Sequence, residues 1–349
     1  MTVTTTSTSL LADDDAVTAA PSRHRVLTGD RPTGPLHLGH YFGTLRNRVR
    51  LQRLGVDTFL VVADYQVITD RAAPGEIAAN VHEVVLDNLA AGIDPRRTTI
   101  FAHSAVPALN QLMLPFLALT TVAELRRNPT VKDEAASAGV SSLSGLLLTY
   151  PVHQAADILF CHGTLVPVGQ DQLPHVEQTR QIARRFNDSH GGEQPVFTEP
   201  QALLSPAPRL LGIDGTKMSK SRGNAIDLRA SEDDTARLVR RAVTDDERVI
   251  TYDPQTRPGV SSLVLTAALA TGQTPESVAE GIGPQGSSAL KALVTEAVNE
   301  ELRPVRARRA EYAAEPGLVE RVLLAGAERA NAEADRTLQR VHTALGMKY

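Results

Sequence analysis

Two histidines and two lysines have the spacing to handle phosphate groups. His37 and His40 lie three residues apart after a Gly/Pro turn, and Lys217 and Lys220 lie three apart in a loop of small hydroxyl residues. Imidazoles at a helix start can donate to phosphate oxygens, and compact ammonium groups on a loop can stabilise charge that moves between phosphates. Either pair alone is compatible with a solvated cap or loop. Both pairs together predict phosphate chemistry.

The elements around these residues alternate between short apolar strands and amphipathic helices. Apolar runs predict strands over residues 25–29, 57–64, 98–104 and 164–168. Such alternation indicates an α/β fold: a Rossmann-like parallel sheet covered by helices on both faces, which binds ligands at the carboxyl ends of its strands. Strand patterns stop near residue 229, so a smaller all-helical domain should follow.

The predicted domain organisation has three parts. Residues 1–22 are rich in Thr, Ser, Ala and Asp and predict a disordered tail. Residues 23–228 should form the catalytic domain. Residues 229–349 should form the helical domain, whose last helix could pack back on the catalytic domain.

Composition narrows the classes of function. The 349 residues carry a net charge of −4 and one cysteine, Cys161. No apolar run is long enough to span a bilayer, and a single cysteine forms neither an internal disulfide nor a cysteine-built metal site. The charge gives no general attraction to nucleic acid, so such binding must depend on local patches. We expect a cytoplasmic protein without a metal centre that binds neither membrane nor DNA.

The sequence around both residue pairs resembles a known family. Residues 37–40 (HLGH) and 217–221 (KMSKS) resemble the two signature motifs of class I aminoacyl-tRNA synthetases. The resemblance continues through residues 150–157 (YPVHQAAD) and 166–172 (VPVGQDQ), and it covers most of the chain from residue 25 to about 312. Within the class, these segments are most similar to bacterial tryptophanyl-tRNA synthetases.

This resemblance implies a ligase that activates L-tryptophan with ATP and Mg²⁺ and transfers it to tRNA(Trp), and it implies a homodimer. The implied catalytic residues are His37, His40, Lys217 and Lys220. The implied ATP contacts are Arg31, Pro32, Thr33, Gly39, His40, Gly169, Gln170, Asp171, Lys217, Met218, Ser219, Lys220 and Ser221, and the implied tryptophan contacts are Gln66, Tyr150, Gln154, Asp157 and Gln172.

Asp157 is the side chain that we expect to recognise the indole ring. A carboxylate on an apolar helix face is costly to bury without a partner, and an indole N–H is a donor with no acceptor capacity. A phenylalanine would leave the carboxylate unpaired, which gives strong discrimination. An aspartate can also accept from a phenol, so Asp157 alone does not separate tryptophan from tyrosine.

Three residues depart from the pattern of the bacterial tryptophan enzymes. Arg31 stands where those enzymes usually have Gln, Gln154 where they tend to have Met, and Gln66 where His is common. The Gln154/Asp157 pair also resembles tyrosyl-tRNA synthetases, so tyrosine–tRNA ligase is the alternative activity. A paralogue that binds tryptophan or RNA as a regulator is the alternative class, and the intact signature motifs argue against it.

Three basic clusters are candidate tRNA contacts, and each is also compatible with a solvated helix face. The last cluster is favoured because its segment resembles the helical anticodon-binding domain of the family. The clusters are Arg126, Arg127 and Lys132; Arg180, Arg184 and Arg185; and Arg303, Arg306, Arg308 and Arg309.

Overall fold

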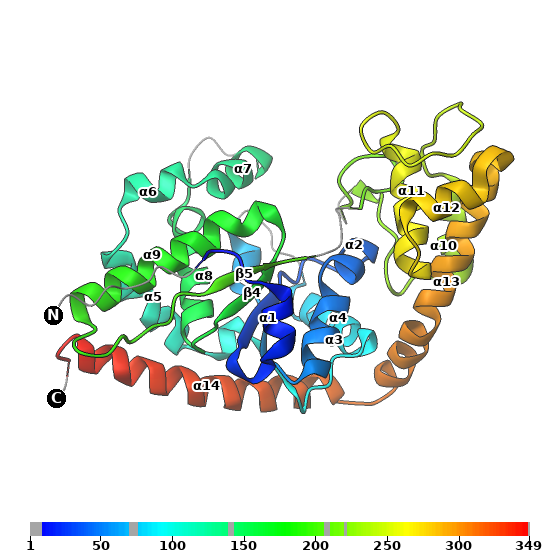
Figure 1. Ribbon diagram of the computed structural model, residues 1–349. Helices are drawn as coiled ribbons and strands as arrows, with labels where there is room; N and C mark the ends of the chain where they lie inside the picture. Colours follow the sequence, from blue (N-terminus) through cyan, green and yellow to red (C-terminus); the bar gives the residue numbers. More distant parts are fainter. Residues whose placement is uncertain (1–8, 70–75, 139–142, 206–209, 220–221, 348–349) are drawn as a thin grey trace.

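The larger lobe of the molecule is built on a parallel sheet (Figure 1). The computed structural model describes residues 9–69, 76–138, 143–205, 210–219 and 222–347. Its five strands lie in the order β3-β2-β1-β4-β5, and every neighbouring pair is parallel. The strands are β1 (Arg25–Asp30), β2 (Asp57–Val62), β3 (Thr98–Ala102), β4 (Leu165–Val168) and β5 (Gln201–Leu204).

The predicted α/β fold and its four strands are confirmed, and β5 was missed. The run Gln201–Leu204 has only four residues and no alternation of apolar and polar side chains. The third strand is shorter than predicted, because the chain turns into a 3-10 helix, η4 (His103–Ala105). This early end places His103 directly after β3.

Helices cover both faces of the sheet, because successive strand residues point to opposite sides. Leu27 and Val61 pack in one core with residues of α5, α8, α9 and α14, whereas Val26 packs in another with residues of α1 and α3. The lobe contains α1 (Asp14–Ala19), α2 (Leu38–His40), α3 (Arg46–Leu54), α4 (Ile77–Ala91), α5 (Ala108–Ala118), α6 (Val122–Arg127), α7 (Pro129–Ala138), α8 (Gly145–Leu159) and α9 (Leu173–His190).

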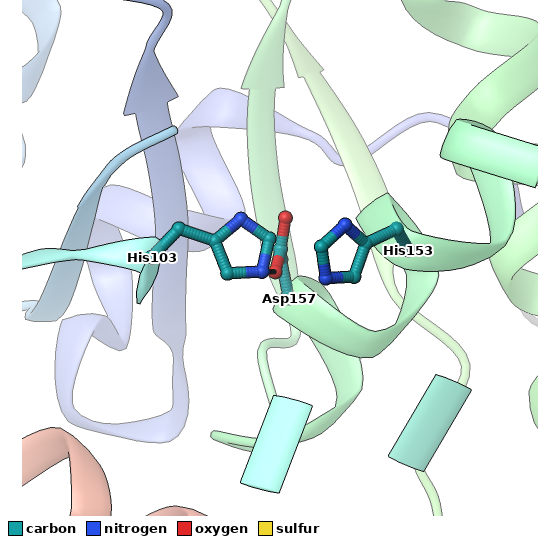
Figure 2. A group of neighbouring side chains, drawn as sticks. All are labelled: His103, His153 and Asp157. Atoms are coloured by element: carbon teal, nitrogen blue, oxygen red, sulfur yellow. Dashed lines mark ion pairs between the residues drawn. The ribbon is translucent and has the colours of Figure 1, made fainter. Parts of the chain in front are cut away.

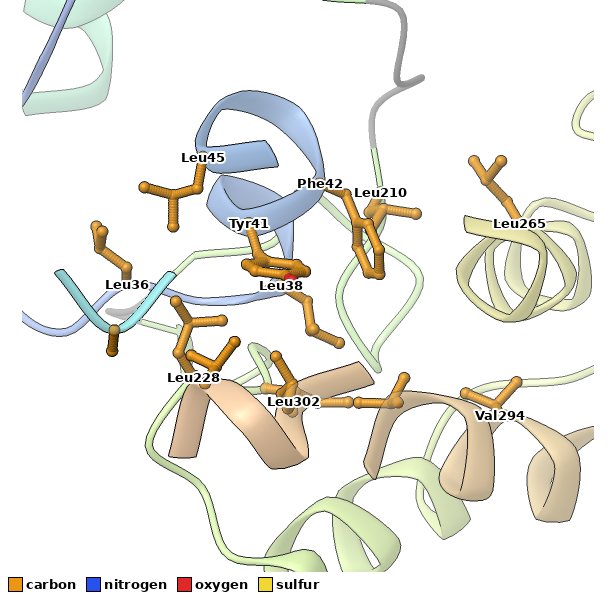
Figure 3. Packing of buried hydrophobic residues seen from close by; sticks show 14 of the residues in the cluster. Leu36, Leu38, Tyr41, Phe42, Leu45, Leu210, Leu228, Leu265, Val294 and Leu302 are labelled. Atoms are coloured by element: carbon orange, nitrogen blue, oxygen red, sulfur yellow. The ribbon is translucent and has the colours of Figure 1, made fainter. Parts of the chain in front are cut away.

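The smaller lobe is helical and shares a core with the start of the larger one. Its helices are α10 (Glu232–Arg240), α11 (Pro258–Thr271), α12 (Pro275–Ile282) and α13 (Gly286–Ala313). Figure 3 shows Leu38 and Phe42 packing toward Leu210 and Leu302, within one buried cluster. The first signature segment is therefore anchored on the helical lobe as well as on the sheet.

The C-terminal helix α14 (Leu318–Ala344) leaves the helical lobe and runs along the sheet lobe (Figure 1). It packs on β3 and α5. A Cβ atom at Gly326 would lie 1.7 Å from the carbonyl oxygen of Ile100, so only glycine lets this helix approach the strand. Among the described residues, no helix is both long and apolar enough to cross a membrane.

The expectation of a disordered tail is corrected for residues 9–22, and residues 1–8 lie outside the described part of the chain. Ala12 N–H donates to the Ala202 carbonyl at 2.9 Å, so the segment runs beside β5. Val17 of α1 is 1% exposed and packs against Val26 and Leu203. The acidic run that favoured disorder instead caps α1, since the Asp13 side chain accepts from a backbone N–H.

Candidate active site

The first signature segment is held by reciprocal caps at a helix start. The Gly39 N–H donates to His37 Nδ1 and the His37 N–H donates to His40 Nδ1, each at 3.2 Å. The two ring centres are 3.8 Å apart. Because each Nδ1 accepts from an N–H, each neutral ring carries its proton on Nε2, where it can donate to a ligand oxygen. The caps thus set the orientation and tautomer of both histidines.

The second signature segment is a loop held together by Asn224. The buried Asn224 amide donates to Asp214 Oδ1 at 2.8 Å and to the Lys217 carbonyl at 3.1 Å, and its oxygen accepts from the Ser219 N–H at 2.8 Å. These bonds fix the backbone while the Lys217 side chain stays exposed. Lys220 and Ser221, which were predicted to act here, lie outside the described residues.

The two signature segments are far apart in the sequence but adjacent in space. The Leu38 N–H donates to the Ile226 carbonyl at 3.0 Å, just after the second segment. A Cβ atom at Gly39 would lie 3.0 Å from the His37 ring and 3.4 Å from Met218 Sδ, so glycine keeps this junction open. The fold therefore places Gly39 of the first segment beside Met218, the neighbour of Lys217 in the second.

A cavity of about 290 Å³ lies at the carboxyl ends of β1, β2 and β4. Parallel sheets bind ligands at this edge. The cavity gathers seven of the residues predicted to contact substrates, and it adds others that the sequence analysis did not single out. The predicted seven are Arg31, Gln66, Tyr150, Gln154, Asp157, Gly169 and Gln172, and the additions include Thr28, Asp30, Thr44, Arg48 and His175.

Asp157 lies between two buried histidines at this cavity (Figure 2). His103 Nε2 is 3.1 Å from Asp157 Oδ1, and the His103 and His153 ring centres are 4.0 Å apart. The short contact is not aligned as a hydrogen bond: within the described residues, that oxygen and all four ring nitrogens have no hydrogen-bond partner. The cluster therefore has donor and acceptor capacity that the protein itself does not use.

Burial sets the charge states of this cluster. It raises the pKa of Asp157, and the nearby charge of Asp64 raises it further. Burial lowers the pKa of His103 to about 3, with a contribution from His153, and lowers the pKa of His153 to about 4. Both imidazoles are therefore neutral at pH 7, and an ionised Asp157 requires a donor from a ligand.

On a second part of the cavity wall, the polar side chains already contact one another. Tyr150 Oη and His175 Nε2 are 3.1 Å apart and buried. Burial lowers the pKa of His175 to about 4, an effect that the charge of Arg31 reinforces and that of Asp171 opposes. The neighbouring Gln172 donates from Nε2 to Asp171 Oδ2 at 3.2 Å. This wall can therefore keep its shape without a ligand.

Beneath the cavity, Asp30 and Arg48 form a buried bidentate ion pair. The two contacts measure 2.6 and 3.0 Å, and Arg48 also donates to Thr28 Oγ1 at 2.9 Å. Asn88 Nδ2 donates to Asp30 Oδ2 at 3.0 Å. Burial alone would raise the pKa of Asp30, but the bonds to Arg48 and Asn88 outweigh it and lower the pKa to about 2. The network fixes the turn after β1, where Arg31 begins the predicted ATP segment.

Several predicted residues lie outside the cavity lining. Pro32 and Thr33 belong to the turn after β1, where the Thr33 N–H donates to the Arg31 carbonyl at 2.8 Å. Gln170 and Asp171 lie in the short helix η5 (Gln170–Gln172) after β4. Of the residues that the sequence analysis missed, His153 had a visible signal, because it lies four residues before Asp157 on the same helix face. Arg48 had none.

The basic cluster at residues 303–309, which the sequence analysis favoured for tRNA binding, mostly contacts other parts of the protein. The preference for this cluster is therefore corrected. Arg308 donates to the Ala90 carbonyl at 2.7 Å and Arg309 to Asp87 at 2.8 Å, so both hold α13 on α4. Arg180 is buried, at 2% exposure. The exposed basic residues on α6 and α7 are Arg126, Arg127 and Lys132.

A Rossmann-like sheet with two adjoining signature segments and a polar cavity defines the class of this protein, a class I aminoacyl-tRNA synthetase. The family described as tRNA synthetases class I (W and Y) matches residues 20–303. The chain is 44% identical to the tryptophan–tRNA ligase of Treponema pallidum over 332 residues, which are 93% of this chain and 97% of that protein. It is 42% identical to the tryptophan–tRNA ligase of Clostridium longisporum, with 93% and 97% covered.

Solved structures agree with this match. The tryptophanyl-tRNA synthetase of Campylobacter jejuni complexed with ADP and tryptophan superposes with a TM-score of 0.77 at 30% identity, covering 92% of this chain and 99% of that one. The tyrosyl-tRNA synthetase of Archaeoglobus fulgidus shares the fold, with a TM-score of 0.66 at 22% identity and coverage of 82% and 90%. The chain belongs to the class I tRNA synthetases of the tryptophan and tyrosine group.

Proposed function

We propose that this chain is a tryptophan–tRNA ligase, with L-tryptophan, ATP and tRNA(Trp) as substrates. The observation that carries the proposal is Asp157, a buried carboxylate on the cavity whose Oδ1 has no hydrogen-bond partner within the described residues. An indole N–H is a donor that would satisfy it. The identity of 44% with a tryptophan–tRNA ligase supports the same substrate.

In the first reaction, an oxygen of the tryptophan carboxylate attacks the α-phosphorus of ATP, the bond to the β-phosphate breaks, and pyrophosphate leaves. The protein contributes positioning and charge rather than a covalent step. His37 and His40 would donate from Nε2 to phosphate oxygens. Lys217, and Lys220 outside the described residues, would stabilise the departing pyrophosphate together with Mg²⁺ bound to the phosphates.

We assign the ATP and tryptophan contacts to residues that line the cavity and to the segments beside it. Arg31, Pro32 and Thr33 would hold ATP from the turn after β1. The segment after β4 would hold its ribose and adenine. Tryptophan would lie with its indole at Asp157 and its amino and carboxylate groups toward Tyr150 and Gln172, with Gln66 and Gln154 on the walls. The segment after β4 comprises Gly169, Gln170 and Asp171. Gly39, Met218 and Ser219 of the two signature segments would also contact ATP, as would Ser221, which lies outside the described residues.

In the second reaction, a hydroxyl of the terminal tRNA ribose attacks the carbonyl carbon of the adenylate and AMP leaves. The tRNA needs basic side chains that are exposed, and Arg126, Arg127 and Lys132 on α6 and α7 meet that need. We further propose a homodimer in the cytoplasm, as the family resemblance implies. The helical domain over residues 229–349 would contact the distal part of the tRNA.

The test is ATP–pyrophosphate exchange with tryptophan and with tyrosine, for wild type and Lys217→Ala. We expect exchange with tryptophan only, and a fall of about 10²-fold in kcat for the variant with tryptophan binding nearly unchanged. Lys291→Ala, which changes a half-buried lysine on α13, is the matched control. Exchange driven by tyrosine would make the chain a tyrosine–tRNA ligase, and full activity of Lys217→Ala would remove the loop from the mechanism.

A further inference from the structure

His103, His153 and Asp157 have the chemistry and placement of a metal site. Each offers one ligand atom, and these atoms all lie within 4.8 Å of one another. The three residues are 1%, 3% and 2% exposed. His153 and Asp157 are four residues apart and share a face of α8, while His103 approaches from the end of β3 (Figure 2).

We propose that these three residues form a transition-metal site suited to Zn²⁺, and that a bound ion competes with tryptophan for Asp157. Neutral imidazoles and a carboxylate are ligands that Zn²⁺ prefers. Two histidines and one carboxylate leave a fourth position of a tetrahedral ion open. That position would face the cavity, because Asp157 lines it.

The distances suit one small ion with limited side-chain rotation. Two ligands of a tetrahedral zinc, bonded at about 2.0–2.1 Å, are separated by roughly 3.3 Å. His103 Nε2 and Asp157 Oδ1 are already 3.1 Å apart. His153 would need to rotate until its ligand nitrogen is equally close, and its ring centre is already 4.0 Å from that of His103.

A bound ion would satisfy more of the unused polar atoms of this cluster than tryptophan alone could. Four ring nitrogens and one carboxylate oxygen of the cluster have no hydrogen-bond partner among the described residues. Burying such atoms unpaired is costly. The indole of tryptophan has a single N–H and can satisfy only a carboxylate oxygen, whereas one ion accepts an electron pair from all three residues.

The charges around the cluster also suit a cation. Asp64 accepts from the Ser104 N–H at 2.9 Å, next to His103, and its carboxylate adds negative potential at Asp157. A divalent ion bound here would occupy the carboxylate that we assign to the indole. Zinc would therefore inhibit tryptophan activation, and tryptophan would weaken zinc binding by the same factor.

The experiment is calorimetric titration of ZnCl₂ into the untagged, chelator-treated full chain, with and without saturating tryptophan. We expect one zinc per chain, a weaker apparent affinity with tryptophan, and a loss of at least 10-fold in affinity for His103→Ala and for His153→Ala. His82→Ala on α4, outside the cluster, is the matched control and should bind zinc like wild type. Circular dichroism and thermal melting confirm that each variant is folded.

Two results would overturn the proposal. If wild type binds no zinc, or if both cluster variants bind it as tightly as wild type, there is no metal site at these residues. If zinc binding depends on the cluster but tryptophan leaves it unchanged, the competition is wrong. Only the competition rests on the proposed function. Because the titration without tryptophan needs no catalytic activity, failure of the ligase assignment and failure of the metal site are distinguishable.

Discussion

Two buried polar clusters adjoin the same cavity, and they differ in how complete they are. Asp30 and Arg48 satisfy each other and bond to Thr28 and Asn88. In the other cluster, Asp157 and its two histidines have unused capacity. A buried network whose members are all paired stabilises a unique fold, whereas unpaired buried atoms cost free energy unless a ligand uses them. The first cluster thus serves the fold, and the second serves a ligand.

The largest expected effect is a loss of stability when the cluster of Asp30 and Arg48 is broken. Asp30→Ala leaves the Arg48 charge buried without its partner, which should lower the free energy of unfolding by about 3–5 kcal/mol. Urea denaturation of the variant and wild type measures this. Glu300→Ala, which breaks an exposed ion pair with Arg303, is the control and should change stability little. Equal effects of the two substitutions would show that the buried pair is not structural.

The cluster of Asp157, His103 and His153 should respond to substitution in the opposite way. Asp157→Asn removes a carboxylate that is costly to bury, so the free energy of unfolding should stay the same or rise. Tryptophan affinity should fall by about 5- to 10-fold, because the indole N–H then donates to a neutral amide oxygen, and a hydrogen bond to a charged group is worth about 1–1.5 kcal/mol more than a neutral one. Denaturation and equilibrium binding on the same samples measure both. A variant that is strongly destabilised and still binds tryptophan normally would reverse the comparison.

The pH dependence of stability should have opposite directions for the carboxylates of Asp30 and Asp157. The pKa of Asp30 is about 2 in the folded protein, below its ordinary 3.8, so its contribution is present above pH 4 and lost as pH falls toward 2. That contribution is roughly 2 kcal/mol, from 1.36 kcal/mol for each pH unit. Asp157 has a raised pKa, so it lowers stability once the pH rises above the ordinary value. Asp30→Asn should make the free energy of unfolding depend less on pH in the acid range. Asp157→Asn should raise the free energy of unfolding only at higher pH. Parallel pH profiles for wild type and Asp30→Asn would contradict this.

The smallest effect concerns a purely apolar contact far from the cavity. Val17→Ala should lower the free energy of unfolding by about 1–2 kcal/mol, because about two buried methylene equivalents are lost. Tryptophan affinity should not change. Thermal melting and the same binding assay report the two quantities. If stability is untouched, α1 is not docked and the tail behaves as the sequence first predicted.

The sequence predicted the parts of this site that depend on local patterns. Apolar runs located β1 to β4, whose carboxyl ends border the cavity, and Gln66 was placed there from the end of β2. Gly169, which also lines the cavity, came from the family resemblance. Asp157 was expected to be buried because it follows an apolar helix face, and it is.

The parts that failed depend on partners distant in the sequence. The pairing of Asp30 with Arg48 needs the strand and the following helix to be placed first. Val17 had too few apolar neighbours in the sequence to predict burial, and its partners Val26 and Leu203 come from other elements. The arginines of α13 were favoured as tRNA contacts because of the family resemblance. Their contacts with Asp87 and Ala90 were not visible in the sequence, because those residues lie on another helix.

The central claim is that the buried carboxylate of Asp157 recognises the indole N–H. The chain contains no tryptophan, so fluorescence excited selectively at the indole comes from the ligand without protein background, and its spectral shift reports binding. The measurement compares the affinities of tryptophan and 1-methyltryptophan, which lacks the N–H, for wild type and Asp157→Ala. The account predicts that wild type prefers tryptophan clearly and that the variant binds both ligands equally weakly. If wild type binds both equally, or if the variant keeps the preference, Asp157 does not recognise the indole and the claim is wrong.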